Sequence, residues 1–182
     1  MPIGVIFVCS ANICRSPMAK GVFRTMVKRA GLEHAFTIDS AGTLEGHEGE
    51  PAAPFARAAA GRRGYDISDH LSRSLTNEDL EKFALPLGMD RSHLAAMRWM
   101  APRTVADRPQ LLLKFAPQTG LLEVGDPFGG PPIGYEDALT LIEAGCKGPA
   151  RGAQAFGGKG QLRPSSPKRF STLKVSRDTS LS

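Results

Sequence analysis

The first thirty residues change from the pattern of a buried strand to that of a helix across one short loop. Residues 3–8 (IGVIFV) are nearly all apolar and rich in β-branched side chains, which is typical of a strand buried on both faces. Ser16 and Pro17 then resemble a helix start, and apolar side chains recur at helical spacing until Gly31, a natural helix end. A buried strand that leads straight into a helix predicts a parallel sheet.

The same alternation of strand and helix patterns continues to about residue 145 of the 182. We therefore predict a single α/β domain, with a four-stranded parallel sheet and helices on both faces. Ligands bind at the carboxyl ends of the strands in such sheets, so the loop after the first strand is the expected site. The further strands are predicted at 35–41, 85–89 and 111–115, and the further helices at 54–63, 76–83, 91–100 and 134–144.

Two of these helices begin with polar capping residues. Thr76 is followed three positions later by Asp79, which resembles a capping box with Asp in place of Glu. Asp90 directly precedes the predicted helix over 91–100 and is a suitable N-cap.

The composition changes beyond Gly145. Gly, Pro, Ser, Lys and Arg dominate, and Pro149 and Gly152 interrupt the last helical pattern. Such a composition buries too little apolar surface to offset chain entropy, so we predict a domain over 1–146 and a basic, disordered tail over 147–182. From Cys146 onward there are eight Lys or Arg residues and one acid, whereas the whole chain has a formal net charge of only +5. The basic charge belongs to the tail and does not indicate nucleic-acid binding by the domain.

The cysteine count is typical of a reducing compartment, and the hydropathy pattern predicts no membrane span. Three cysteines, an odd number, do not form a disulfide framework. The apolar start is too short to span a bilayer and carries no basic leader, and no later stretch reaches transmembrane length. We expect a cytoplasmic protein with no membrane span. No His or Cys cluster has the spacing of metal ligands, and no cofactor is expected.

The loop after the first strand has Cys9 and Arg15 separated by five residues. A helix start directs free backbone N–H groups and partial positive charge into the loop, which makes a cradle for an anion. Arg15 adds a planar fork that matches two phosphate oxygens. The same field favours a Cys9 thiolate placed for attack on a bound phosphate, and Ser16 can donate its hydroxyl toward the sulfur. A lone cysteine is more often a small core residue, but the strand–loop–helix context favours the catalytic interpretation.

Further motifs follow in a fixed order, and together with the loop they resemble one family. The sequence VCSANICRSP resembles the low-molecular-weight protein tyrosine phosphatases, and the resemblance covers about residues 3 to 146. The other matching segments are DSAGT (39–43), SDH (68–70), SRSLT (72–76), MD (89–90) and DPF (126–128).

The resemblance implies a protein tyrosine phosphatase that forms a cysteinyl-phosphate without a metal. Cys9 matches the nucleophile and Arg15 the phosphate-binding arginine. Asp126 matches the general acid, although an Asp before a Pro is usually only a turn residue. The implied partners are phosphotyrosine-containing proteins, with inorganic phosphate as product.

The remaining matches are substrate-binding and supporting residues. Asn12 matches the residue that braces the loop, and Ser40 and His70 match its polar supports. The implied substrate-binding residues are Ser10, Ala11, Asn12, Ile13, Cys14, Ser16 and Phe128.

The sequence also differs from the family near the substrate cleft. Many members have an aromatic side chain near position 46, where this chain has Gly46 followed by His47. Phe128 is expected to form the opposite wall, and His47 is expected to be a solvated loop residue.

Three alternative functions share the fold or the loop. An arsenate reductase needs further cysteines in relay, but none lies between Cys14 and Cys146. A phosphoarginine phosphatase has Thr at the position of Ile13, and Ile13 favours an aryl ester instead. A non-catalytic phosphate-binding module would lack the acid, which Asp126 argues against.

A redox function of the loop is also predicted. Cys14 lies five residues from Cys9, and a curled loop can bring two sulfurs within disulfide distance.

Overall fold

The computed structural model describes residues 1–155. Its centre is a parallel four-stranded sheet in the order β2-β1-β3-β4, which confirms the predicted fold class. Strand β1 pairs with β2 from Ile3↔Phe36 to Cys9↔Gly42 and with β3 from Val5↔Leu85 to Val8↔Gly88. The strands are β1 (Ile3–Cys9), β2 (Phe36–Gly42), β3 (Leu85–Gly88) and β4 (Gln110–Leu111).

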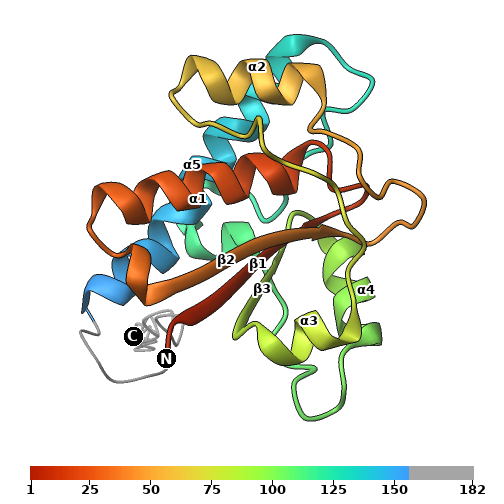
Figure 1. Cartoon of the computed structure of the whole chain (residues 1–182), viewed down its shortest axis with the longest axis vertical. Helices are drawn as coiled ribbons and strands as arrows, with labels where there is room; N and C mark the ends of the chain where they lie inside the picture. Colours follow the sequence, from red (N-terminus) through yellow and green to blue (C-terminus); the bar gives the residue numbers. More distant parts are fainter. Residues whose placement is uncertain (156–182) are drawn as a thin grey trace, which may run out of the picture.

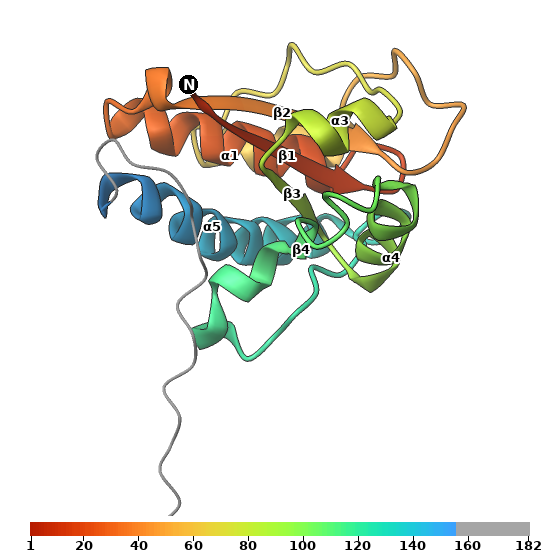
Figure 2. The same ribbon diagram turned by 90° about the horizontal axis from the view of Figure 1, so that it is seen from below.

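Helices cover both faces of the sheet. Helices α1 and α5 pack on one face, with α2 against both of them, while α3 and α4 lie on the opposite face (Figures 1 and 2). The helices are α1 (Arg15–Arg29), α2 (Pro54–Arg62), α3 (Asn77–Lys82), α4 (Arg91–Met100) and α5 (Pro132–Ala155), and the 3-10 turns are η1 (Glu33–Ala35), η2 (Leu112–Phe115) and η3 (Pro117–Thr119).

The central strand β1 supplies side chains to both layers. Val5 and Phe7 join the apolar cluster beneath α1 and α5, whereas Ile6 and Val8 join the cluster beneath α3 and α4. All four side chains are fully buried. Because burial of each such side chain contributes about 1.5–3 kcal/mol, the strand is held firmly on both sides and its carboxyl end is fixed in place.

The caps predicted for two helices are present. Thr76 accepts from the backbone N–H of Asp79, and the Asp79 carboxylate accepts in return from the Thr76 N–H. The Asp90 carboxylate accepts from the backbone N–H groups of Ser92 and His93 at the start of α4. Local polar caps of this kind are readable from sequence because both partners lie within one helical turn.

The predicted strand over 111–115 is wrong. Only Gln110 and Leu111 pair with β3, and the chain then turns into η2. Leu112 and Leu113 are fully buried, so the run is apolar because of its burial against other elements and not because of strand pairing. A short apolar run does not distinguish a buried strand from a buried helical turn.

The predicted end of the last helix at residue 144 is also wrong. Helix α5 continues through Pro149 to Ala155, over the first part of the segment predicted to be disordered. Two of its glycines lie where the helix closely approaches η2: a Cβ on Gly145 would stand 2.6 Å from Leu112 Cγ, and one on Gly148 would stand 2.6 Å from Phe115 Cβ. These glycines allow close packing rather than ending the helix. The remainder of the predicted tail, 156–182, lies outside the described residues.

Within residues 1–155, no helix is long and apolar enough to cross a membrane. The same residues contain no group of three or more His, Cys, Asp or Glu side chains arranged to hold a metal ion.

Candidate active site

The loop between β1 and α1 forms the floor of a cavity of about 270 Å³ at the carboxyl ends of the strands. Eight of the residues predicted for the site line this cavity, and Leu44 and His47 line it in addition. The eight are Cys9, Ser10, Ala11, Ile13, Cys14, Arg15, Asp126 and Phe128.

Cys9 is the last residue of β1, and its thiol lies beside the first turn of α1. Its Sγ is 2.9 Å from Ser16 Oγ. The Ser16 oxygen already accepts a hydrogen bond from Asn12 Nδ2 at 2.8 Å, so the Ser16 hydroxyl proton is free to point toward the sulfur. The sulfur therefore has a hydrogen-bond donor beside it, at the positive end of a fifteen-residue helix.

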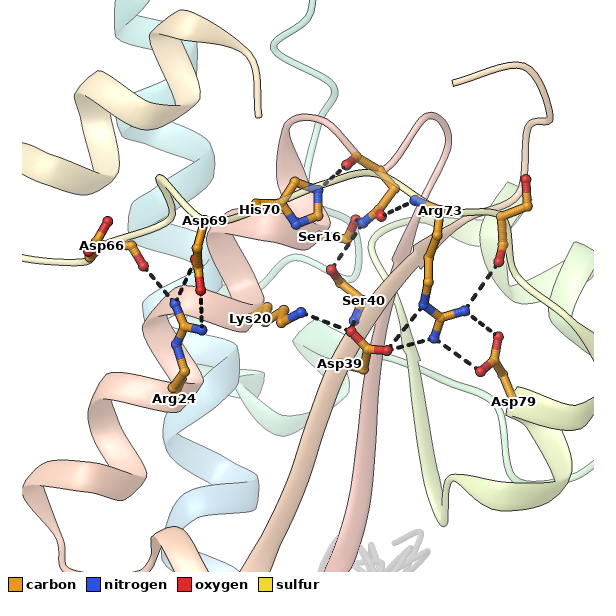
Figure 3. Close-up of polar contacts among 12 residues, drawn as sticks. Ser16, Lys20, Arg24, Asp39, Ser40, Asp66, Asp69, His70, Arg73 and Asp79 are labelled. Atoms are coloured by element: carbon orange, nitrogen blue, oxygen red, sulfur yellow. Dashed lines mark hydrogen bonds and ion pairs between the residues drawn. The ribbon is translucent and has the colours of Figure 1, made fainter. Parts of the chain in front are cut away.

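Asn12 braces the loop from inside the protein. It is fully buried and adopts a left-handed conformation with φ 57°, which Asn tolerates better than most residues. Its Nδ2 also donates to Ser40 Oγ at 3.1 Å, and its Oδ1 accepts from the Arg73 backbone N–H at 3.0 Å. His70 Nε2 donates to the Asn12 carbonyl at 2.6 Å. Figure 3 shows Ser40 and His70 near Ser16, and the side chain of Arg73 turned toward Asp39 and Asp79.

A charged cluster supports this brace from β2 and α3. Arg73 contacts Asp39 and Asp79, each at 2.8 Å, and Lys20 lies 2.9 Å from Asp39 (Figure 3). Burial alone would raise the pKa of Asp39 and Asp79, but their hydrogen bonds to these cations outweigh it and hold both pKa values below the ordinary range. The segment that carries His70 and Arg73 is thereby fixed to the sheet.

Arg15 is almost fully buried, and its side chain contacts residues that follow β3 and residues that precede α5. Its Nη1 donates to Asp90 Oδ2 at 2.8 Å and to the Val124 carbonyl at 3.0 Å. Its Nη2 lies 3.1 Å from Asp126 Oδ2, on the cavity side. Burial alone would raise the pKa of Asp90, but hydrogen bonds from Ser92 and Arg15 hold it below the ordinary value. A carboxylate at Asp90 therefore compensates the buried guanidinium.

Asp126 and Phe128 lie on the segment that leads into α5. The Asp126 side chain is about half exposed, and its Oδ1 accepts from the Phe128 backbone N–H at 3.2 Å. The Phe128 ring is largely exposed at the cavity mouth. The acidic group thus lines the cavity beside Arg15 and remains accessible.

Four residues at or near this site were not predicted from the sequence to belong to it. Leu44 and His47 line the cavity, and His47 is also the partly exposed loop residue that was expected, with its Nδ1 3.1 Å from Glu50 Oε1. Asp90 had been identified only as a helix cap, and His93 had no predicted role. Asp90 follows the carboxyl end of β3, and the preference of ligands for that edge of a parallel sheet was the available signal.

The arrangement suits a phosphate monoester with a flat apolar group. A thiol, a buried guanidinium and a helix N-terminus converge at the cavity floor, where the oxygens of an anion would be bound. Ile13, Leu44 and Phe128 provide apolar surface around it. The carboxyl group of Asp126 lines the same cavity, and a carboxyl group there can exchange a proton with a bound ligand.

Comparisons with known proteins agree with this geometry. The sequence matches the family described as "Low molecular weight phosphotyrosine protein phosphatase" over residues 4–155. It is 41% identical over 151 residues to a low molecular weight protein-tyrosine-phosphatase of Streptomyces coelicolor, with 81% of this chain and 92% of that protein covered.

Two solved structures have the same fold. YfkJ from Bacillus subtilis superposes with a TM-score of 0.80 at 32% identity, covering 85% of this chain and 96% of its own. The YwlE arginine phosphatase gives a TM-score of 0.74 at 29% identity, covering 84% of this chain and 96% of its own. With the sequence match over nearly all of the described residues, these findings show that the chain belongs to the low molecular weight phosphotyrosine protein phosphatase family.

Proposed function

We propose that this protein hydrolyses phosphotyrosine in proteins, and small aryl phosphates, through a cysteinyl-phosphate intermediate. One observation carries the proposal. Cys9 Sγ lies 2.9 Å from Ser16 Oγ at the start of α1, in one cavity with the Arg15 guanidinium and the Asp126 carboxyl group. These are a nucleophile, an anion-binding group and an acid within reach of a single substrate.

In the first step the Cys9 thiolate attacks phosphorus. The new S–P bond forms as the bond between phosphorus and the aryl oxygen breaks, and Asp126 gives its proton to that leaving oxygen. The guanidinium of Arg15 and the backbone N–H groups of the loop bind the equatorial oxygens as their charge grows.

In the second step a water molecule attacks the cysteinyl-phosphate. Asp126, now a carboxylate, takes a proton from the water, and Cys9 leaves as a thiolate that the Ser16 hydroxyl stabilises. Inorganic phosphate is released, and the enzyme returns to its starting protonation state. Every step uses side chains of this chain, with Asn12, Ser40 and His70 holding the loop in shape.

The walls of the cavity favour an aromatic leaving group. Ile13, Leu44 and Phe128 present apolar surface to the part of the substrate beyond the phosphate. Burial of such a group contributes in proportion to its apolar area, which is larger for a phenol ring than for a polar guanidino group. For the same reason we do not favour phosphoarginine, although YwlE has the same fold. Cys146 is fully buried and contacts the Ala19 carbonyl, which places it in the core and argues against an arsenate relay.

We further propose that Cys9 and Cys14 form a reversible disulfide under oxidation. Both are free thiols in the loop. Burial raises the pKa of Cys14 to about 11, partly offset by its hydrogen bond to Tyr135, so Cys14 is protonated at neutral pH. Peroxide would therefore oxidise Cys9 first, and Cys14 would then act as the resolving thiol. A reducing cytoplasmic setting stays a prediction that fits this chemistry.

The test compares three substrates without added metal: a phosphotyrosine peptide, phosphoarginine and arsenate with a thiol reductant. We expect release of inorganic phosphate from the phosphotyrosine peptide, and much slower turnover of the other two. The Cys9→Ser variant, purified in the same way, is the control for contaminating phosphatases. Preferred turnover of phosphoarginine would replace the proposed substrate, and phosphate binding without turnover of any ester would indicate a binding module.

A further inference from the structure

His93 in α4 contacts the catalytic loop although it lies more than eighty positions away in sequence. Its side chain is 1% exposed, and its Nε2 is 2.9 Å from Ser10 Oγ. Its other ring nitrogen, Nδ1, accepts from the backbone N–H of Asp90 at 3.2 Å and also lies 3.1 Å from Asp90 Oδ1. The imidazole thus bridges the start of α4 and the residue that follows Cys9.

The partners of the ring determine where its proton lies. Of the two Asp90 atoms near Nδ1, only the backbone N–H forms a hydrogen bond with it, so Nδ1 accepts and the proton of the neutral ring is on Nε2. Burial lowers the pKa of His93 to about 4, which Asp90 and Asp126 oppose and Arg15 reinforces, so the ring is neutral at physiological pH. Nε2–H therefore donates to Ser10 Oγ.

This bond sets the direction of the Ser10 hydroxyl. Once Oγ accepts from His93, the hydroxyl proton of Ser10 is left to donate elsewhere. Ser10 lines the cavity next to Cys9, where acceptors in a bound substrate would be phosphoryl oxygens. A hydroxyl without the His93 contact would be free to rotate, and part of its donor strength would be lost to other orientations.

We propose that His93 is a positioning residue that turns the Ser10 hydroxyl into a fixed donor to a phosphoryl oxygen. The inference rests on the proposed phosphatase function. It adds one side-chain donor to the anion cradle formed by the loop and Arg15, and it gives α4 a function in phosphate binding. His93 itself does not touch the substrate.

A purely structural role would not need this geometry. The capping contact with Asp90 uses Nδ1 alone, and an Asn at this position could make it with its side-chain oxygen. A side chain longer than Asn is needed to place a second polar atom within reach of Ser10. Asn and Gln therefore separate the two contacts: His93→Asn keeps an acceptor for the cap and loses the contact with Ser10, whereas His93→Gln can place an amide N–H near the position of Nε2.

The test is a double-mutant cycle on Ser10→Ala and His93→Asn. The measured quantities are kcat and KM for p-nitrophenyl phosphate and the inhibition constant of inorganic phosphate. Each single variant is expected to raise the inhibition constant about tenfold, as for loss of one hydrogen bond to a charged group. The double variant should be no weaker than either single variant, because His93 acts through Ser10. His93→Gln should recover most of the phosphate affinity.

Ser92→Ala is the matched control from the same turn of α4. Ser92 Oγ donates to Asp90 Oδ1 and makes no described contact with Ser10. Any effect of Ser92→Ala on phosphate affinity should therefore add to that of Ser10→Ala. Additive effects of His93→Asn and Ser10→Ala, or an unchanged inhibition constant in Ser10→Ala, would overturn the inference.

Two further outcomes keep the test decisive. If thermal unfolding shows that His93→Asn does not fold, the cycle is run with His93→Gln instead. An inhibition constant of phosphate equal to that of wild type in His93→Gln supports the inference. An increase in that constant that adds to the effect of Ser10→Ala rejects it. If wild type itself hydrolyses no aryl phosphate, the proposed function fails, whereas an active wild type with an additive cycle rejects only the role of His93.

Discussion

Arg15 and Asp90 form a 2.8 Å ion pair behind the cavity, between Nη1 of the arginine and Oδ2 of the aspartate. The same Nη1 also donates to the Val124 carbonyl, so this edge of the guanidinium is fully used by the protein. The Nη2 atom faces Asp126 and the cavity. Asp90 therefore both neutralises a buried cation and fixes which edge of Arg15 faces a bound anion.

Asp90→Asn removes the charge of this pair and keeps a side-chain oxygen for the cap of α4. We expect kcat/KM on an aryl phosphate to fall by about 10²-fold, because a small displacement of a catalytic group has an effect of that size. The matched control is Glu123→Gln, which removes an exposed ion pair with Arg91 at the same end of α4 and should leave kcat/KM nearly unchanged. Equal effects of the two substitutions would contradict an orienting role for Asp90.

The nucleophile is tested by separating turnover from binding. Cys9→Ser should abolish turnover and retain affinity for inorganic phosphate, since the loop N–H groups and Arg15 remain. Arg15→Lys should lose nearly all activity because a point charge cannot replace the two-pronged guanidinium. Steady-state kinetics measure turnover in each variant, and calorimetry measures its affinity for inorganic phosphate. Full activity in Cys9→Ser would rule out the covalent mechanism.

The general acid is tested with leaving groups of different basicity. Asp126→Asn should lower kcat by about 10²–10⁴-fold for a phenyl phosphate, the usual contribution of a positioned acid. The loss should shrink for an aryl ester whose phenolate leaves without a proton. A loss of the same size for every leaving group would indicate that Asp126, which also contacts Arg15 and the Phe128 backbone, is structural.

The paired cysteines predict reversible inactivation by peroxide. Wild type should regain activity with a dithiol reductant and show a Cys9–Cys14 crosslink by mass spectrometry. Cys14→Ser should be an active phosphatase that peroxide inactivates irreversibly, because no second thiol captures the sulfenic acid on Cys9. Cys146→Ser is the control, since Cys146 is fully buried on the Ala19 side of α5 and should not alter recovery. If Cys14→Ser regained activity after peroxide treatment as fully as wild type, Cys14 would have only a packing role.

The parts of the site that residue patterns alone predicted are encoded locally, whereas Asp126, Phe128, Ser40 and His70 were expected only from the family resemblance. Strand β1, the loop and the first turn of α1 form one continuous segment, so the positions of Cys9, Arg15 and Ser16 follow from a single pattern. The capping contacts of Thr76 and Asp90 were predictable for the same reason. The other side of the cavity depends on long-range contacts: His93 meets Ser10, and Leu44 meets the loop, only because the sheet order places their segments side by side.

The error in the last helix has a similar origin. The helical pattern fades beyond Gly145, and Pro149 and Gly152 disfavour a helix by intrinsic propensity, which predicted an early end. In the folded chain Gly145 and Gly148 lie against η2 and the helix packs on α1, so tertiary contacts outweigh the propensity of single residues. A pattern of glycines facing one neighbour is visible only once that neighbour is placed.

Close packing of α5 predicts an unusual response to a glycine substitution. Alanine normally stabilises a helix relative to glycine, but at Gly145 its Cβ would stand 2.6 Å from Leu112 Cγ and 3.2 Å from the Leu112 carbonyl oxygen. We therefore expect Gly145→Ala to lower the free energy of unfolding by about 1–3 kcal/mol, as for other overpacked cores. The control is Gly61→Ala in α2, where a Cβ meets nothing within 4 Å and the change should stabilise by about 0.4–1 kcal/mol. Urea unfolding followed by circular dichroism measures both. Stabilisation by Gly145→Ala would mean that α5 does not pack closely on η2.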